Sequence, residues 1–218
     1  MTAPVDLAKV YGCPLPPANL ADRKMPVCEL QLASTPLLRI HRSVYDPIYY
    51  NRRSSGGDQF RFDAAGDEFG VLYASPSFTV CMAETVIRGR FQNGADENWL
   101  DENVLSIRSV SELGFEEGRA LILADLTKPL IQLGFDNRIL SIDDYRGPNL
   151  WSTAIHRAFP HLDGLYFTSR YANGPSVAIF DRTKLVSRGA PVPLMRHPLL
   201  PGFLNEYDIN LDPFPGLR

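Results

Sequence analysis

The sequence predicts a single α+β domain, built as a mixed sheet with packed helices. Segments typical of strands and helices are interspersed, but they lack the regular alternation of a parallel βαβ sheet. The chain has 218 residues, of which 44% are hydrophobic, enough for a sizeable core. We expect residues 1–35 to form an N-terminal extension wrapped on the domain. Residues 36–218 would form the domain together with its C-terminal tail.

Short apolar and β-branched runs predict the strands of this domain. The predicted strands are residues 37–41, 70–75, 104–107, 120–126, 164–169 and 177–181. Asn173 and Gly174, a pair that favours tight turns, join the last two strands. The polar residues 43–68 predict a long loop, and loops of that length inside a domain are often functional.

Helical patterns occupy three places in the sequence, one in the N-terminal extension and two between the predicted strands. A short helix is expected around residues 7–10, and Pro148 suits the first turn of another. The third helix is expected over residues 78–88, where the hydroxyl of Ser77 can cap the first turn. This third helix is largely apolar, which predicts burial, and Glu84 lies at the edge of its apolar face.

Composition excludes several classes of protein. The net charge of −3 argues against a bulk basic surface for nucleic acid, so we expect no direct nucleic-acid binding. The three cysteines include no CxxC pair, which favours a reducing compartment. The N-terminus lacks the pattern of a secretory signal, and no apolar run is long enough for a membrane span. We therefore expect a soluble, cytoplasmic protein with no membrane association.

Familiar cofactor and hydrolase motifs are absent from the sequence. It contains no GxGxxG, no GxxxxGK[ST], no HExxH and no GxSxG. The spacing of the four histidines indicates no metal site. We expect neither a bound metal nor a recycled cofactor.

Five residues carry candidate chemistry. Tyr73 on a predicted strand and Glu84 on the next helix are eleven positions apart, and Arg61 precedes them closely. Arg39 lies upstream, and Ser169 lies downstream at a strand end. Each has an ordinary alternative: a surface arginine, a core tyrosine or a serine that caps a turn. Their order and context argue for a shared site.

Glu84 also has two possible interpretations. It could form an i,i+4 ion pair with Arg88 on a partly exposed helix face. Alternatively, it is a carboxylate held on a rigid, buried helix that faces a cleft. Its surroundings favour the second interpretation.

These segments resemble the RES domain family, named for its Arg, Glu and Ser. The resemblance runs from about residue 37 to residue 182 and rests on short segments of sequence. They are RIHR, RFD followed by FGVLYAS, AET in the helix, and DGLYFTS followed by VAIFD. Many members carry a GGRWN-like segment where this chain has GGDQFRFD. Arg42 is an alternative to Arg39 for the first arginine.

The resemblance implies a fold like that of ADP-ribosyltransferases and chemistry on NAD, which is then a substrate. It implies that Arg39 and Arg61 bind the phosphates and that Tyr73 contacts the nicotinamide or its ribose. Glu84 would be the catalytic carboxylate, because cleavage of the nicotinamide–ribose bond develops positive charge on the ribose. Ser169 would complete the pocket.

Members of the family are commonly toxins, and an Xre-type antitoxin that binds DNA usually covers their active site. We therefore expect a toxin that cleaves NAD as a glycohydrolase or phosphorylase, in a hetero-oligomer with its antitoxin. Alternatives are an ADP-ribosyltransferase that modifies a specific host protein, a secreted antibacterial effector, and a catalytically inactive binding module. Met82, two positions before Glu84, cannot activate a nucleophile, which favours a small acceptor, either water or phosphate.

Overall fold

The predicted α+β class is confirmed in the computed structural model, which describes residues 7–56, 58–88, 98–116 and 118–213. The main sheet has five strands in the order β1-β6-β7-β8-β3. They are β1 (Val27–Gln31), β3 (Val71–Ala74), β6 (Ala120–Asp125), β7 (Gly164–Thr168) and β8 (Pro175–Phe180). Strands β6 and β7 are parallel, whereas the other neighbours are antiparallel, so the sheet is mixed.

A second sheet lies beside the first. Its central strand β5 (Arg108–Gly114) pairs with β2 (Leu37–Arg42) and with the short strands β9 (Val186–Ser187) and β10 (Val192–Pro193). A bridge between Leu38 and Ser75 joins β2 to the end of β3. Near the C-terminus, β11 (Asn210–Asp212) pairs in parallel with β4 (Trp99–Asp101).

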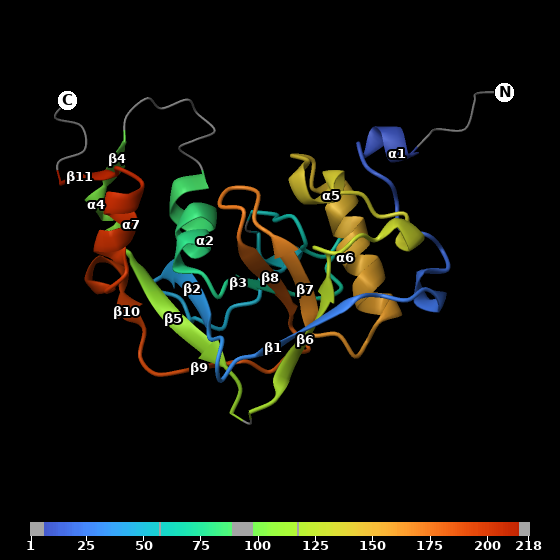
Figure 1. The fold of residues 1–218 in the computed structure, drawn as a ribbon, viewed down its shortest axis with the longest axis horizontal. Coiled ribbons are helices and arrows are strands. Elements are labelled where there is room, and N and C mark those ends of the chain that lie inside the picture. Colours follow the sequence, from blue (N-terminus) through green and yellow to red (C-terminus); the bar gives the residue numbers. More distant parts are fainter. Residues whose placement is uncertain (1–6, 57, 89–97, 117, 214–218) are drawn as a thin grey trace.

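Helices surround the two sheets (Figure 1). They are α1 (Leu7–Val10), α2 (Phe78–Met82), α4 (Glu102–Ser106), α5 (Arg138–Ser141), α6 (Arg146–Ala158) and α7 (Leu200–Glu206). The π-helical turn η3 (Ala83–Ile87) continues α2, and 3-10 turns occur at η1 (Leu20–Asp22), η2 (Arg53–Ser55), η4 (Ile131–Leu133) and η5 (Leu194–Arg196). Helices α5 and α6 lie on one side of α2, and α4 and α7 lie on the other (Figure 1). No helix in the described part of the chain is both long and apolar enough to span a lipid bilayer.

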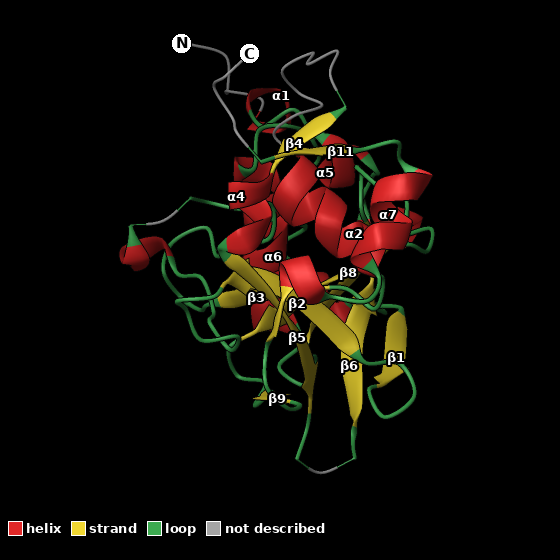
Figure 2. Cartoon of the chain, turned by 90° about the vertical axis from the view of Figure 1, so that its left-hand side faces the viewer, coloured by secondary structure: helices red, strands yellow, loops and turns green. Residues whose placement is uncertain are grey.

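Both faces of the main sheet are buried. In β8, Ala178 packs in a core that includes Trp151 of α6, whereas Ile179 packs in a core that includes Leu37 and Leu113 of the second sheet. Successive strand residues point to opposite faces, so this alternation places α6 and the second sheet on opposite sides. Figure 2 shows α2, α5 and α7 gathered above the strands of the two larger sheets, with β4 and β11 higher still.

The N-terminal extension packs against α6 and also joins the main sheet through β1. The indole Nε1 of Trp151 donates a hydrogen bond to the Pro14 carbonyl at 2.7 Å. Cys13 lies against Gly147, where an added Cβ would come within 2.3 Å of its Sγ. Glycine is therefore the residue that allows the extension to approach α6 this closely.

The predicted strand at residues 104–107 is wrong, because this segment lies in and just after helix α4. The carboxylate of Asp101 accepts a hydrogen bond from the Asn103 amide at 2.7 Å and caps the first turn. The next strand, β5, begins only at Arg108. The β-branched Val104 and Ile107 suggested a strand, but the local cap decides the conformation.

The predicted helix over residues 78–88 begins at Phe78, and the Ser77 hydroxyl accepts a hydrogen bond from the Val80 amide at 3.3 Å. From Ala83 it continues as the π-helical turn η3. Single π-turns inside helices occur frequently at functional sites. Glu84 lies within this turn.

Candidate active site

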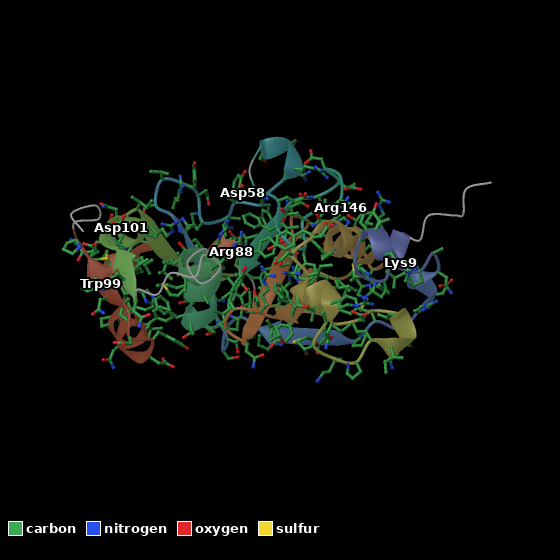
Figure 3. The ribbon with its side chains drawn as sticks, turned by 90° about the horizontal axis from the view of Figure 1, so that it is seen from above. Lys9, Asp58, Arg88, Trp99, Asp101 and Arg146 are labelled. Atoms are coloured by element: carbon green, nitrogen blue, oxygen red, sulfur yellow. The ribbon has the colours of Figure 1, made fainter. Side chains whose placement is uncertain are left out.

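A pocket of about 460 Å³ lies where β2, β3 and η3 meet the start of α6 and the segment after β7. Its lining includes six arginines, Arg39, Arg42, Arg61, Arg88, Arg108 and Arg170, but only two carboxylates, Asp58 and Glu84. Several aromatic rings also line it, among them Tyr49, Phe60, Tyr73, Tyr145 and Tyr171. Asp58 and Arg88, which both line the pocket, are labelled toward the middle of the molecule in the view of Figure 3. The pocket combines excess positive charge with flat aromatic surfaces.

Ser169 holds the carboxylate of Glu84 in place. The Ser169 hydroxyl donates a hydrogen bond to Oε1 of Glu84 at 2.6 Å. Oγ of Ser169 in turn accepts hydrogen bonds from the amides of Tyr171 and Ala172, both at 3.2 Å, which orient the hydroxyl. Ser169 is buried, with 1% of its surface exposed. The structure thus brings together two of the predicted residues that are 85 positions apart.

The alternative partner of Glu84 does not pair with it. Among the ion pairs between described residues, none joins Glu84 to Arg88. The guanidinium of Arg88 instead lies over the ring of Phe60, 5.3 Å from its centroid. The Glu84 carboxylate is therefore available to a ligand in the pocket.

Tyr73 presents its ring to the pocket, while its hydroxyl is bound within the protein. The hydroxyl donates to Oδ1 of Asp63 at 3.0 Å and accepts from the Phe62 amide at 2.8 Å. Burial raises the pKa of Tyr73 well above its usual value, and the charge of Asp63 adds to this effect. Because the only hydroxyl proton is donated to Asp63, the ring is the part of Tyr73 suited to contact a ligand.

Arg61 has an unsatisfied donor group. Its Nη1 donates to the carbonyls of Ile139 and Ile142, at 3.1 and 2.8 Å, and its guanidinium lies 4.8 Å from the centroid of the Tyr145 ring. Its Nη2 is buried and has no hydrogen-bond partner among the described residues. Burial lowers the pKa of Arg61. An anionic ligand in the pocket would satisfy this donor and offset the cost of burying the charge.

Arg39 and Arg42, the two candidates for the first arginine of the site, both line the pocket. Nη1 of Arg39 donates to the carbonyls of Pro47 and Tyr49, at 3.1 and 2.8 Å. Burial lowers the pKa of Arg39 to about 10, and the side chain therefore stays protonated at neutral pH. Arg42 is exposed at the end of β2.

Ion pairs with carboxylates are less frequent among the six pocket arginines than among the ten described arginines outside the pocket, of which five have one. Elsewhere, Arg52, Arg119, Arg138, Arg146 and Arg157 each contact a carboxylate. Of the six pocket arginines, only Arg170 does so, with Asp143 at 2.6 Å. No ion pair between described residues includes any of the other five pocket arginines. The pocket is thus suited to a multiply charged anion.

Helix α6 supports the segment that carries Arg61. Asn149 donates from Nδ2 to the carbonyls of Phe60 and Arg61, at 2.8 and 3.0 Å, and Ser152 donates to the Phe62 carbonyl at 2.6 Å. These supporting residues were not among the predicted site residues. Asn149 and Ser152 are spaced i, i+3, so two polar residues on the core-facing side of α6 were the available signal.

The sequence and the fold of the chain are similar to those of known proteins. The model of the RES domain matches residues 36–199, and no curated protein matches the chain. A chain in the crystal structure of the M. tuberculosis MbcT–MbcA toxin–antitoxin complex has a similar fold, with a TM-score of 0.54 and 20% sequence identity. That similarity covers 73% of this chain and 85% of the other. Because the family model matches well over half of the sequence, the protein belongs to the RES domain family.

Proposed function

We propose that the protein is the toxin of a toxin–antitoxin pair and that it cleaves the nicotinamide–ribose bond of NAD. The observation that carries this proposal is the Glu84 carboxylate, fixed by Ser169 at 2.6 Å in a pocket lined by arginines. Membership of the RES domain family and the fold shared with a chain of a toxin–antitoxin complex support it.

The proposed chemistry depends on the fixed negative charge of one carboxylate in the pocket. Departure of nicotinamide leaves positive charge on the ribose, and a fixed carboxylate stabilises that charge in the transition state. Glu84 would play this role, with its orientation held by Ser169. The aromatic ring of Tyr73 would pack against the nicotinamide or its ribose. The protein requires no metal or recycled cofactor in this scheme.

Binding of the dinucleotide would depend on the arginines. A guanidinium group matches the geometry of phosphate oxygens and keeps its charge at neutral pH. Arg39 and Arg61, whose Nη2 has no hydrogen-bond partner among the described residues, would bind the pyrophosphate. Substitution of Arg39 by Ala should therefore weaken NAD binding more than substitution of Arg42, as a binding titration would show.

A small acceptor, water or phosphate, is favoured over a protein acceptor. Met82 lies two positions before Glu84 and is completely buried, so it cannot contact or activate an acceptor. An ADP-ribosyltransferase that modifies a specific protein is the second candidate. Incubation with labelled NAD and a cell lysate distinguishes the two, because only the second leaves covalent label on a protein.

The direct test is the rate of nicotinamide release from NAD by purified wild-type protein and by Glu84→Gln. The variant keeps size and hydrogen bonding but loses the negative charge, so we expect a loss of about 10²–10³-fold in kcat. Glu102→Gln, on α4 and outside the pocket, is the matched control and should keep wild-type activity. Turnover by Glu84→Gln near the wild-type rate would contradict the catalytic role.

The toxin role and its partner need a test in cells. Expression of the chain alone in a bacterium should lower cellular NAD and arrest growth. Co-expression of an adjacent antitoxin gene, which we propose to be of the Xre type, should restore growth. An unchanged NAD pool during verified expression of folded protein would count against the toxin proposal and favour a binding module.

A further inference from the structure

Two pocket arginines face each other directly across a pair of strands. Arg42 at the end of β2 is the register partner of Arg108 at the start of β5. Like charges at directly opposed positions destabilise a sheet. Burial, together with the positive charge of Arg42, lowers the pKa of Arg108, which also donates from Nη1 to the Val104 carbonyl. No ion pair between described residues relieves this repulsion.

The charge of the pocket exceeds what NAD can neutralise. If Arg170 is set aside because Asp143 pairs with it, five arginines remain against Asp58 and Glu84, a surplus of three positive charges. NAD brings two negative phosphates and one positive pyridinium, a net charge of minus one, so about two positive charges remain. A phosphate monoester carries about −1.5 to −2 at pH 7 and would balance them.

We propose that Arg42 and Arg108 form a second anion subsite in the pocket, which binds a phosphate dianion separately from the pyrophosphate of the dinucleotide. The inference rests on the proposed function, because it assigns Arg39 and Arg61 to the pyrophosphate. Two guanidinium groups on neighbouring strands can each donate hydrogen bonds to the same phosphate. The bound anion would also remove the cross-strand repulsion.

Two sources of phosphate fit this chemistry. One is the 2′-phosphate of NADP, a group that arginine commonly recognises in dinucleotide sites. The other is free inorganic phosphate. In the first case the subsite sets a preference for NADP over NAD, and in the second it makes the reaction depend on phosphate concentration.

The test compares wild type with Arg42→Gln and Arg108→Gln. The control is Arg138→Gln, an arginine paired with Asp136 and outside the pocket. Initial rates with NAD and with NADP in phosphate-free buffer give kcat/KM for each. A titration with inorganic phosphate then gives its half-saturating concentration. Arg42 is exposed, so its variant should fold even if Arg108→Gln does not.

Loss of one charge-assisted contact should change either kcat/KM for NADP or the half-saturating concentration of phosphate by about tenfold to a hundredfold. A fall in kcat/KM for NADP with NAD unchanged supports the subsite and identifies the 2′-phosphate. A matching rise in the half-saturating concentration of inorganic phosphate supports it and identifies free phosphate. An equal loss with NAD and NADP, or no change in any quantity, overturns the inference.

A separate outcome tests the proposed function alone. If wild type cleaves neither dinucleotide, that function is wrong, and the subsite is then judged by calorimetric titration of inorganic phosphate. If inorganic phosphate binds wild type and both substitutions weaken that binding, the subsite is supported. If phosphate binds all the proteins equally, or binds none of them, the subsite is rejected.

Discussion

Replacement of Ser169 by alanine tests how much its hydrogen bond to Glu84 contributes to catalysis. The Ser169 hydroxyl donates to the Glu84 carboxylate at 2.6 Å, a distance typical of a bond to a charged group. Such bonds contribute about 1.5–3 kcal/mol. If Ser169 holds Glu84 in its catalytic orientation, kcat/KM for NAD should fall about tenfold to a hundredfold, since about 1.4 kcal/mol corresponds to one factor of ten.

Ser169→Ala should cost less free energy of unfolding than it costs in catalysis. Ser169→Ala also leaves the amides of Tyr171 and Ala172 without an acceptor, but both contacts are long, at 3.2 Å. We therefore expect the free energy of unfolding to fall by about 1–2 kcal/mol. Urea unfolding measures this cost, and nicotinamide release measures the activity.

Ser111→Ala is the matched control for Ser169→Ala. Ser111 is also buried, and its hydroxyl lies 2.9 Å from Nε2 of His41, outside the pocket. The control should lose comparable stability but keep its activity. If Ser169→Ala keeps kcat/KM within twofold of wild type, or if both variants lose activity equally, the reasoning fails.

Two further predictions concern groups with shifted pKa values. Tyr73→Phe should lower the free energy of unfolding by about 1–3 kcal/mol, because buried Asp63 loses a hydrogen-bond donor. The same change should alter KM for NAD only slightly. A large rise in KM with unchanged stability would instead assign the hydroxyl to the ligand. His156 stacks on Phe69 at 4.0 Å, and burial, together with the nearby charge of Arg182, lowers its pKa from 6.5 to about 4. The unfolded chain then binds the proton first, so stability present above pH 6.5 should fall by on the order of 1–2 kcal/mol by pH 4.5. Urea unfolding at both pH values should show a smaller decrease for His156→Gln, and equal decreases would refute this account.

Strong local patterns predicted the fold where they existed. The apolar runs at residues 164–169 and 177–181 correspond closely to β7 and β8. Pro148 was correctly expected in the first turn of α6. Strand β1 was missed because Val27–Gln31 forms a sheet edge, and its exposed residues alternate with only half-buried ones. The helix α4 was missed because its cap at Asp101 outweighed a strand-like composition.

The candidate site could be predicted in part, through residues with a recognisable context. Arg39, Arg61, Tyr73 and Glu84 all line the pocket, and Ser169 contacts Glu84. Their proposed catalytic and binding roles stay predictions. Of the other pocket arginines, Arg88 lies four positions after Glu84 and Arg170 directly follows Ser169, whereas Arg108 belongs to no local pattern, because only tertiary packing brings β5 to the pocket.

The pairing of β3 with β8 has a consequence for the order in which the protein becomes active during synthesis. Tyr73 on β3 is the register partner of Ala178 on β8, roughly 100 positions later in the chain. At the usual rate of translation, that length takes roughly 5–20 s to emerge. Until then β3 lacks its partner in the main sheet, and Ser169 is not yet present to hold Glu84. A growing or prematurely terminated chain would therefore lack the proposed activity, and the time of synthesis itself would delay the appearance of that activity.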